Sequence, residues 1–239
     1  RLTALLAAGL PVAAPRTDPI LIDGRVWAIY RRLPGRPLAP SNTDEAGYRA
    51  LGRALADYHA VARTLSPPPQ RPGWRPYAEC FAPPADGPGR GALLDRLART
   101  DPGQAEAFGK AAEALQARRL PSVLEGLPVL AVHGDFSPWN LLMKDGAVSG
   151  ILDFEAAHLD AAAADLAFAR RGSHDAVVWG YLERQPLSDA ELAALDGLWT
   201  GAVLHGVWTV LAAQAGGIGS LDWNFQQLGK TRPYRAAPA

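Results

Sequence analysis

The stretch AVHGDFSPWNLLMKDGAVSGILDFE, residues 131–155, decides the fold class of this chain. It carries an HxDxxxxN pattern at His133, Asp135 and Asn140, followed by an apolar run that ends at Asp153. An aspartate can take the proton of an acceptor hydroxyl, and oxygen-bearing side chains can hold Mg²⁺ against nucleotide phosphates. This combination of residue types therefore indicates phosphoryl transfer to a small molecule.

The apolar runs around these residues predict their local structure. Residues 129–132, 141–143 and 148–152 are short and apolar, and the turn residues 144–146 separate the last two runs. This order predicts a strand, a polar loop and a β-hairpin. We expect the hairpin to return the chain so that Asp153 emerges beside the loop, which would bring three oxygen-bearing side chains to one point.

A lone HxDxxxxN match could be incidental, because a chain with 24 acidic residues can match so loose a pattern by chance. The joint pattern is more specific. It combines HGD after a strand, an asparagine five residues beyond the aspartate, a tight hairpin, and then ILDFE. Strand ends accept most polar residues, so packing alone does not require Asp, Asn and Asp at these positions. We therefore interpret the set as functional.

At these residues the chain resembles the aminoglycoside phosphotransferase and choline kinase family, which are small-molecule kinases built on the protein-kinase fold. The resemblance covers HGDFSPWNLL (133–142) and GILDFEAAHLDAAAADLA (150–167), and more weakly YRRLPGRPL (30–38) and LGRALADYHAV (51–61). It implies an α+β, protein-kinase-like fold: a mostly helical C-terminal lobe, a catalytic β-hairpin and a partial N-terminal β lobe.

The resemblance also implies roles for individual residues. Asp135 would be the catalytic base, His133 would orient the loop, and Asn140 and Asp153 would be the metal ligands. Asp165 would support the catalytic loop from the following helix. That expectation has a physical basis, because Asp165 lies within the apolar run AAAADLAFA and a buried carboxylate needs hydrogen-bond donors, which loop amides can supply. The alternative is a partly exposed aspartate on the solvent side.

The N-terminal residues are predicted to be a remnant of the small nucleotide-binding lobe, residues 1–33, and residues 34–239 the helical catalytic and substrate lobe. Apolar residues at helical spacing come first, then two strands at residues 20–22 and 26–30 around an Asp-Gly turn. In the resembled family the nucleotide base meets the crossover that follows. Tyr30, Arg31 and Arg32 are therefore nucleotide-binding candidates, although arginines at a strand exit are often simply solvated.

Three residues are candidates for binding the acceptor. Glu155 and Asp160 follow the metal aspartate closely and could receive an amine-bearing substrate, such as an amino sugar or a choline-like alcohol. Equally, they could cap the next helix, whose dipole favours acidic residues at its start. Trp139 could offer its ring face to a cation or a sugar, or pack against the lobe.

The chain departs from the family in its phosphate-gripping parts. Kinases of this fold add a glycine-rich loop and a strand lysine, but the three lysines, Lys110, Lys144 and Lys230, all lie after the expected crossover. We favour a sequence that begins partway through a longer product, because it starts at Arg1 and residues 1–33 match only the latter half of a small lobe. The alternative is a shortened, catalytically inactive kinase-like binding module.

The expected activity follows from these points. It is transfer of a γ-phosphate from ATP or GTP, with Mg²⁺, to a hydroxyl of a small, amine-bearing acceptor. Equal numbers of basic and acidic residues, 24 each, argue against a nucleic-acid partner. The single cysteine, Cys80, is expected to be an inert thiol and suits a reducing cytoplasm. The sequence predicts no oligomeric state.

The remaining pattern is mostly helical. Ser41 and Asp44 fit a capping box before an apolar stripe that includes His59, which we expect to be packed and hydrogen-bonded. Further helices are predicted from Asp101, at about residues 160–170 and 175–184, and from residue 188 onward. The apolar run 198–219 is interrupted by polar residues and glycines, so a buried helix is favoured over a membrane span. Residues 66–91 are predicted to be an irregular connection.

Overall fold

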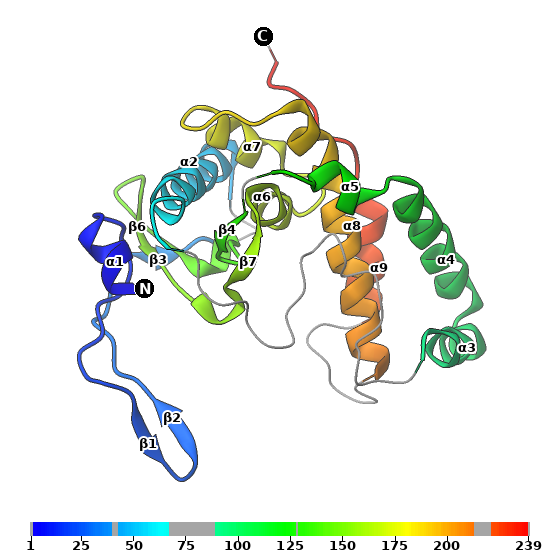
Figure 1. Cartoon of the computed structure of the whole chain (residues 1–239), viewed down its shortest axis with the longest axis horizontal. Coiled ribbons are helices and arrows are strands. Elements are labelled where there is room, and N and C mark those ends of the chain that lie inside the picture. Colours follow the sequence, from blue (N-terminus) through cyan, green and yellow to red (C-terminus); the bar gives the residue numbers. More distant parts are fainter. Residues whose placement is uncertain (1, 40–42, 67–88, 128, 213–220, 239) are drawn as a thin grey trace.

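The helices form the bulk of the molecule. In this computed structural model, residues 2–39, 43–66, 89–127, 129–212 and 221–238 are described. The long helix α8 (Asp189–Ala212) lies beside α9 (Leu221–Lys230), and α6 (Ala162–Arg170) packs against α8 on its other side (Figure 1). Helices α2 (Glu45–Ala62) and α7 (Asp175–Leu182) pack against each other, and both contact α6. The outer helices are α3 (Arg90–Thr100), α4 (Pro102–Ala117) and the short α5 (Leu120–Leu124).

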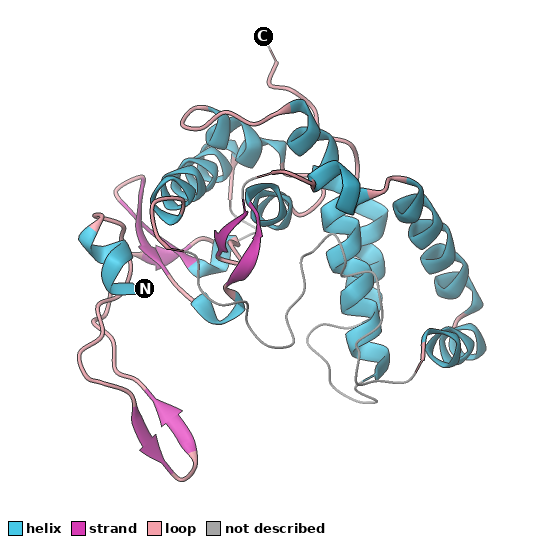
Figure 2. Cartoon of the chain, in the orientation of Figure 1, coloured by secondary structure: helices cyan, strands magenta, loops and turns pink. Residues whose placement is uncertain are grey.

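The described residues form three small sheets beside the helices (Figure 2), and all ladders in these sheets are antiparallel. The hairpin predicted from sequence is confirmed as β5 (Leu141–Lys144) and β6 (Ala147–Ile151). Its edge carries β3 (Arg36–Pro37), a strand that the sequence analysis missed. The predicted strand before the loop is β4 (Val129–Val132), and it pairs with β7 (His158–Ala161).

The N-terminal segment has one buried and one exposed part. Helix α1 (Leu2–Ala7) leads into the core, where Leu5 and Val12 are buried, and Ile151 donates its N–H to the carbonyl of Pro11 (2.8 Å). Strands β1 (Ile20–Ile22) and β2 (Arg25–Trp27) then form a hairpin that extends away from the helical body (Figure 1). The second strand is shorter than the predicted 26–30.

Two expectations about helix starts are corrected. The N-cap of α2 is Asp44, whose side chain accepts from Gly47 N, whereas Ser41 lies outside the described residues. The helix expected from about residue 160 begins at Ala162, because residues 158–161 pair with β4 as a strand. The helix from Asp101 is confirmed, with Asp101 as its N-cap accepting from Gln104 N at 2.9 Å.

Helices α2 and α7 approach each other through glycine. A Cβ atom at Gly52 would lie 1.9 Å from the carbonyl oxygen of Val177, and one at Gly180 would lie 2.0 Å from that of Arg49. The close approach places His59 of α2 against Tyr181 of α7. It therefore fixes the position of one partner of the catalytic loop described below.

Two further expectations concern the chain as a whole. Among the described helices there is no candidate for a membrane span, and the described part of the 198–219 run continues helix α8. Cys80, and most of the predicted irregular connection at residues 66–91, lie outside the described residues.

Candidate functional site

The loop between β4 and β5 contains the HxDxxxxN residues. Gly134 has a φ of +83°, and a Cβ atom there would lie 2.2 Å from the carbonyl oxygen of Ala156, so this position requires glycine. A short 3₁₀ helix, Pro138–Asn140, then leads directly into β5. The loop thus turns sharply at Gly134 and presents Asp135, which is about one-third exposed, at its outer side.

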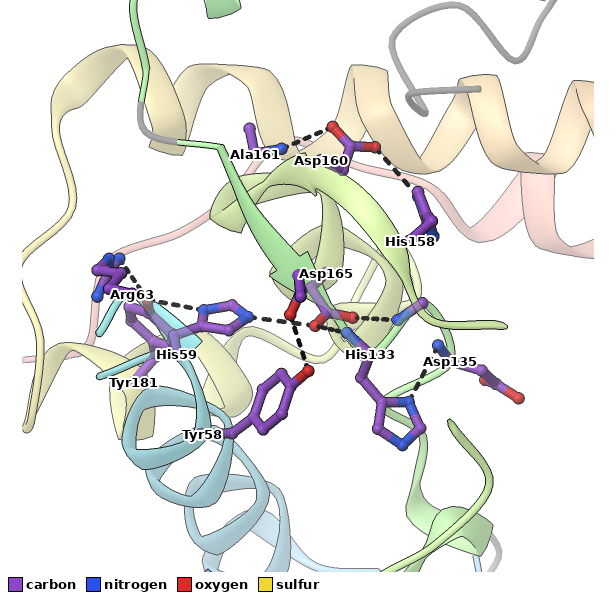
Figure 3. A network of polar contacts seen from close by, with 12 residues as sticks. Tyr58, His59, Arg63, His133, Asp135, His158, Asp160, Ala161, Asp165 and Tyr181 are labelled. Atoms are coloured by element: carbon purple, nitrogen blue, oxygen red, sulfur yellow. Dashed lines mark hydrogen bonds and ion pairs between the residues drawn. The ribbon is translucent and has the colours of Figure 1, made fainter. Parts of the chain in front are cut away.

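A buried carboxylate of helix α6 anchors the loop through backbone hydrogen bonds. Asp165 of α6 is fully buried and accepts hydrogen bonds from His133 N (2.7 Å) and Gly134 N (3.0 Å). Figure 3 shows these bonds and the third one, from His59 Nε2 at 3.2 Å. On its other side His59 pairs with the Tyr181 hydroxyl at 3.0 Å. The prediction that His59 is packed and hydrogen-bonded is confirmed.

The electrostatic balance at Asp165 favours the charged form. Burial alone would raise the pKa of this carboxyl group, but the hydrogen bond from His59, the electrostatic interactions with His59 and His133, and the hydrogen bond from the His133 amide outweigh it and lower the pKa. An ionised carboxylate can only accept, so His59 donates at Nε2 and its Nδ1 accepts from the Tyr181 hydroxyl. Every donor that faces Asp165 is therefore complementary to its charge.

His133 connects the loop to the end of the hairpin. Its Nε2 donates to the carbonyl of Leu152 (2.8 Å), and its Nδ1 accepts from Asp135 N (3.3 Å). Leu152 N in turn donates to the carbonyl of Asn140 (2.8 Å). Both backbone groups of Leu152 are thus bonded to the loop. Asp153, the next residue, is consequently tied to the loop that carries Asp135 and Asn140.

Asn140 holds one oxygen of Asp135. Its Nδ2 donates to Asp135 Oδ2 (3.0 Å) and to the Asp135 carbonyl (2.9 Å), which assigns the orientation of the amide. The other carboxylate oxygen, Oδ1, is buried and accepts no hydrogen bond within the described part of the chain. Asp135 therefore has one oxygen fixed by Asn140 and one buried oxygen that no described hydrogen bond occupies.

Asn140 and Asp153 have the right chemistry for a hard cation. Asp153 is exposed and has a left-handed backbone, with φ of +62°, while no described residue donates to Asn140 Oδ1. The described residues contain no cluster of three or more His, Cys, Asp or Glu side chains that could bind a metal by themselves. Mg²⁺ in nucleotide sites commonly takes one or two protein oxygens and completes its shell with phosphates and water, so the pair fits that mode.

The nucleotide candidates lie apart from this loop. Tyr30 is exposed and forms an isolated antiparallel bridge with Pro15, and Arg31 N donates to the carbonyl of Ala14 (2.8 Å). Arg32 is exposed as well. Within the described ranges, no hydrogen bond or ion pair joins the three side chains to Asp135, Asn140 or Asp153.

The acceptor candidates separate into different environments. Glu155 is exposed on the short 3₁₀ helix Phe154–Ala156, directly after Asp153. Asp160 is buried in β7, where its Oδ1 accepts from Ala161 N and its Oδ2 lies 3.5 Å from His158 Nε2. Asp160 thus lies in a strand, where Figure 3 shows it between Ala161 and His158, and its proposed role in acceptor binding stays a prediction.

Asp160 helps to raise the pKa of His158. Burial lowers the pKa of His158, but the bond to Asp160, the bond to the Ala156 carbonyl and the charges of Asp160 and Asp165 outweigh it and raise the pKa. The pair is internal to the β4–β7 ladder. We therefore assign it to the stability of that ladder.

Trp139 already contacts a cation from the chain itself. The guanidinium of Arg171 lies 4.0 Å from its ring centre, and one nitrogen of that guanidinium lies 3.6 Å from Asp135 Oδ1. Sequence reasoning missed Arg171, which follows α6. Its signal was weak, since RRG after an apolar helix usually indicates only a basic helix end.

The fold and the loop agree with a comparison against known protein families. A model of the phosphotransferase enzyme family matches residues 1–212, so the chain belongs to that family. A homoserine kinase of Phenylobacterium zucineum is 33% identical over 218 residues, which cover 83% of this chain and 61% of the relative. The resemblance inferred from the sequence is confirmed.

Solved structures agree on the fold. An amicoumacin kinase in complex with AMP-PNP, Ca²⁺ and Ami superposes with a TM-score of 0.67 at 15% identity, covering 98% of this chain and 76% of that one. A choline/ethanolamine kinase family protein of Mesorhizobium loti has a TM-score of 0.60 at 14% identity, with 96% and 75% covered. The expected α+β, protein-kinase-like fold class is confirmed.

Proposed function

We propose that this chain is the catalytic part of a small-molecule kinase that transfers the γ-phosphate of ATP or GTP to an acceptor hydroxyl. The observation that carries the proposal is the state of Asp135. One of its oxygens is fixed by Asn140, and the other is buried without a hydrogen bond from the described residues. A carboxylate held in this way is suited to orient a hydroxyl and take its proton.

In the proposed reaction, the acceptor hydroxyl donates its hydrogen bond to Asp135 Oδ1. Its oxygen forms a bond to the γ-phosphorus, the bond from that phosphorus to the bridging oxygen breaks, and the nucleoside diphosphate leaves. Asp135 takes the hydroxyl proton. Asp165 and His133 keep the loop in place through the bonds described above.

Asn140 and Asp153 would hold Mg²⁺ in this proposal. The ion would neutralise charge on the nucleotide phosphates when bound. What the chain itself contributes is the connection through Leu152, which keeps Asp153 tied to Asn140 by backbone hydrogen bonds. This backbone connection supports the proposal that the two oxygen donors act together.

The division into residues 1–33 and residues 34–239 remains a proposal about lobes. Its support is the exposed hairpin of β1 and β2, and Tyr30, Arg31 and Arg32 remain nucleotide candidates on that side. The chain spans 61–65% of the length of the first curated relatives, so the activity of the whole protein belongs to this proposal. A nucleotide-dependent kinase of this type would act in the cytoplasm.

The acceptor is proposed to be a small amino alcohol or hydroxy amino acid. The most similar curated relatives carry the name homoserine kinase, and homoserine combines an amine, a carboxylate and a primary hydroxyl. Glu155 is exposed next to Asp153 and is the proposed contact for the amine. Homoserine is therefore the first acceptor to test.

The test uses the full-length gene product and measures phosphorylated acceptor by mass spectrometry. Asp135→Asn should lower turnover by on the order of 10² to 10⁴, while Mg-nucleotide affinity changes little. Asp153→Asn should instead weaken Mg-nucleotide binding. The matched control is Asp57→Asn, because Asp57 is an exposed aspartate on α2.

Two outcomes would count against the proposal. Unchanged turnover of the Asp135 variant would remove that residue from the mechanism. A wild-type protein that binds Mg-nucleotide but phosphorylates no amino alcohol, hydroxy amino acid or amino sugar would favour the binding module.

A further inference from the structure

Arg171 occupies an aromatic cage beside the proposed base. Its guanidinium carbon lies 4.0 Å from the ring centre of Trp139, and 5.5 to 5.9 Å from three more rings: Phe168, Trp199 and Trp223. The side chain is only 11% exposed. These rings come from the catalytic loop, α6, α8 and α9, so four separate elements converge on one cation.

The same guanidinium covers the available oxygen of Asp135. Its Nη2 lies 3.6 Å from Oδ1, which is an ion pair but longer than a hydrogen bond. Oδ1 is inaccessible to solvent in this arrangement. An acceptor hydroxyl can therefore reach Oδ1 only if the guanidinium shifts away from it.

The backbone under Arg171 is specialised as well. Arg171 ends α6 in the left-handed region, with φ of +50°, where glycine is the usual residue. Gly172 follows with φ of +74°, and a Cβ atom there would lie 2.7 Å from Trp199 Cδ1. The chain thus places an arginine at a helix end where the backbone conformation favours glycine, and here, unlike at the exposed Arg119, the side chain lies among aromatic rings beside Asp135.

We propose that Arg171 is the receptor for an acidic group on the acceptor, so that the enzyme selects alcohols that carry a carboxylate. This proposal rests on the function proposed above and names its substrate class. The carboxylate replaces Asp135 as the partner of the guanidinium, and that exchange uncovers Oδ1 for the hydroxyl of the same molecule. Arg171 is a specificity-determining residue in this scheme.

Physical chemistry favours an anion over a cation here. Arginine presents a planar fork that binds a carboxylate with two parallel hydrogen bonds, and partial removal of water strengthens such bonds. The cage that could hold an ammonium group is already filled by the arginine. An acceptor with only a positive charge would meet a like charge at the entrance to Asp135 and gain no partner that draws Arg171 away.

The test compares two acceptors in the full-length gene product: L-homoserine and 3-amino-1-propanol, which is homoserine without its carboxylate. Wild type should prefer homoserine in kcat/KM by about 10- to 100-fold, the range of a hydrogen bond to a charged group. Arg171→Met should remove most of this preference. Arg171→Lys keeps the charge but loses the fork, so its preference should be intermediate.

Arg53→Met is the matched control. Arg53 is a partly exposed arginine of α2 that pairs with Glu183, and its loss should leave the preference unchanged. Thermal melting of each variant shows whether it is folded. Calorimetric binding of both acceptors to wild type and to Arg171→Lys gives a second readout that needs no phosphoryl transfer.

The outcomes separate this proposal from the proposed function. Equal use or equal binding of the two acceptors by wild type, or an unchanged preference in folded Arg171→Met, overturns the role of Arg171 and leaves the kinase activity standing. No phosphorylation of either acceptor, together with selective binding of homoserine that Arg171→Lys weakens, supports the receptor and contradicts the kinase.

Discussion

Replacing Asp165 by asparagine tests whether the buried carboxylate holds the catalytic loop. The substitution keeps the size of the side chain and removes the charge and one acceptor oxygen. Asp165 now accepts three hydrogen bonds, from the amides of His133 and Gly134 and from His59. An asparagine can accept only through one oxygen, and its NH₂ group would face at least one of these donors.

The expected cost follows from that geometry. Leaving one buried donor unpaired costs about 1–3 kcal/mol, and bonds to a charged group contribute more than neutral ones. The site is fully buried, so water compensates little. We expect Asp165→Asn to lower the free energy of unfolding by about 2–4 kcal/mol, with most of the loss in the loop.

Urea unfolding followed by tryptophan fluorescence measures the global loss, and Asp57→Asn on the surface of α2 is the control. Hydrogen exchange of the peptide spanning residues 131–140 measures the local one, because His133 and Gly134 N–H would lose their acceptor. A change below about 0.5 kcal/mol with unchanged exchange would refute the anchoring argument.

The pH dependence supplies an independent check on the same residue. The pKa of Asp165 is lowered in the folded protein, so its contribution is complete above the unfolded value of about 3.9 and is lost as pH falls through the folded value. The difference in unfolding free energy between wild type and Asp165→Asn should therefore be constant near neutral pH and shrink below about pH 4. A difference that grows on acidification would contradict this sign.

Three further predictions concern other parts of the chain. Gly180→Ala should destabilise by about 1–3 kcal/mol in urea unfolding, because its Cβ would lie 2.0 Å from a backbone oxygen of α2, whereas Gly109→Ala in α4 has open space and should be neutral or stabilising. The pKa of His158 is raised in the folded state, so the stability cost of His158→Gln should be largest below the ordinary histidine pKa and should shrink as pH rises through the folded pKa. Asp153→Gly and Asp145→Gly both relieve a left-handed backbone, so the melting temperature of each variant should be unchanged or raised. Only Asp153→Gly should weaken the binding of Mg-nucleotide in calorimetry.

Local patterns made the central hairpin predictable. The apolar runs and the Asp145-Gly146 turn are adjacent in sequence, and both residues have the positive φ that such a turn requires. Long-range pairing was not predictable in the same way. Strand β7 exists because residues 158–161 meet β4 across the catalytic loop, and no local periodicity distinguishes HLDA from the start of a helix.

The candidate site shows the same division. Asp135 and Asn140 are hydrogen-bonded because they share one loop, and the hairpin ties the residue before Asp153 to that loop, as the spacing predicted; their roles stay predictions. The cage around Arg171 joins residues as far apart as Trp139 and Trp223, and only the packing of α6, α8 and α9 brings them together. The spacing of residues along the sequence cannot predict contacts that only tertiary packing creates.

Five non-glycine residues among those described have a left-handed backbone, a conformation in which glycine is usually preferred. Asp23 and Asp145 precede glycines in hairpin turns, and Arg119 is exposed just after α4, so turn and helix-end geometry account for these three. Arg171 also ends a helix, but its guanidinium lies 3.6 Å from Asp135, and Asp153 follows Leu152, whose backbone groups are bonded to the loop of Asp135. A left-handed backbone costs energy at Asp153 and at Arg171, the two positions near Asp135. Such a cost is expected where a charged side chain must be placed for a ligand, and the stability of the fold alone gives no reason for it.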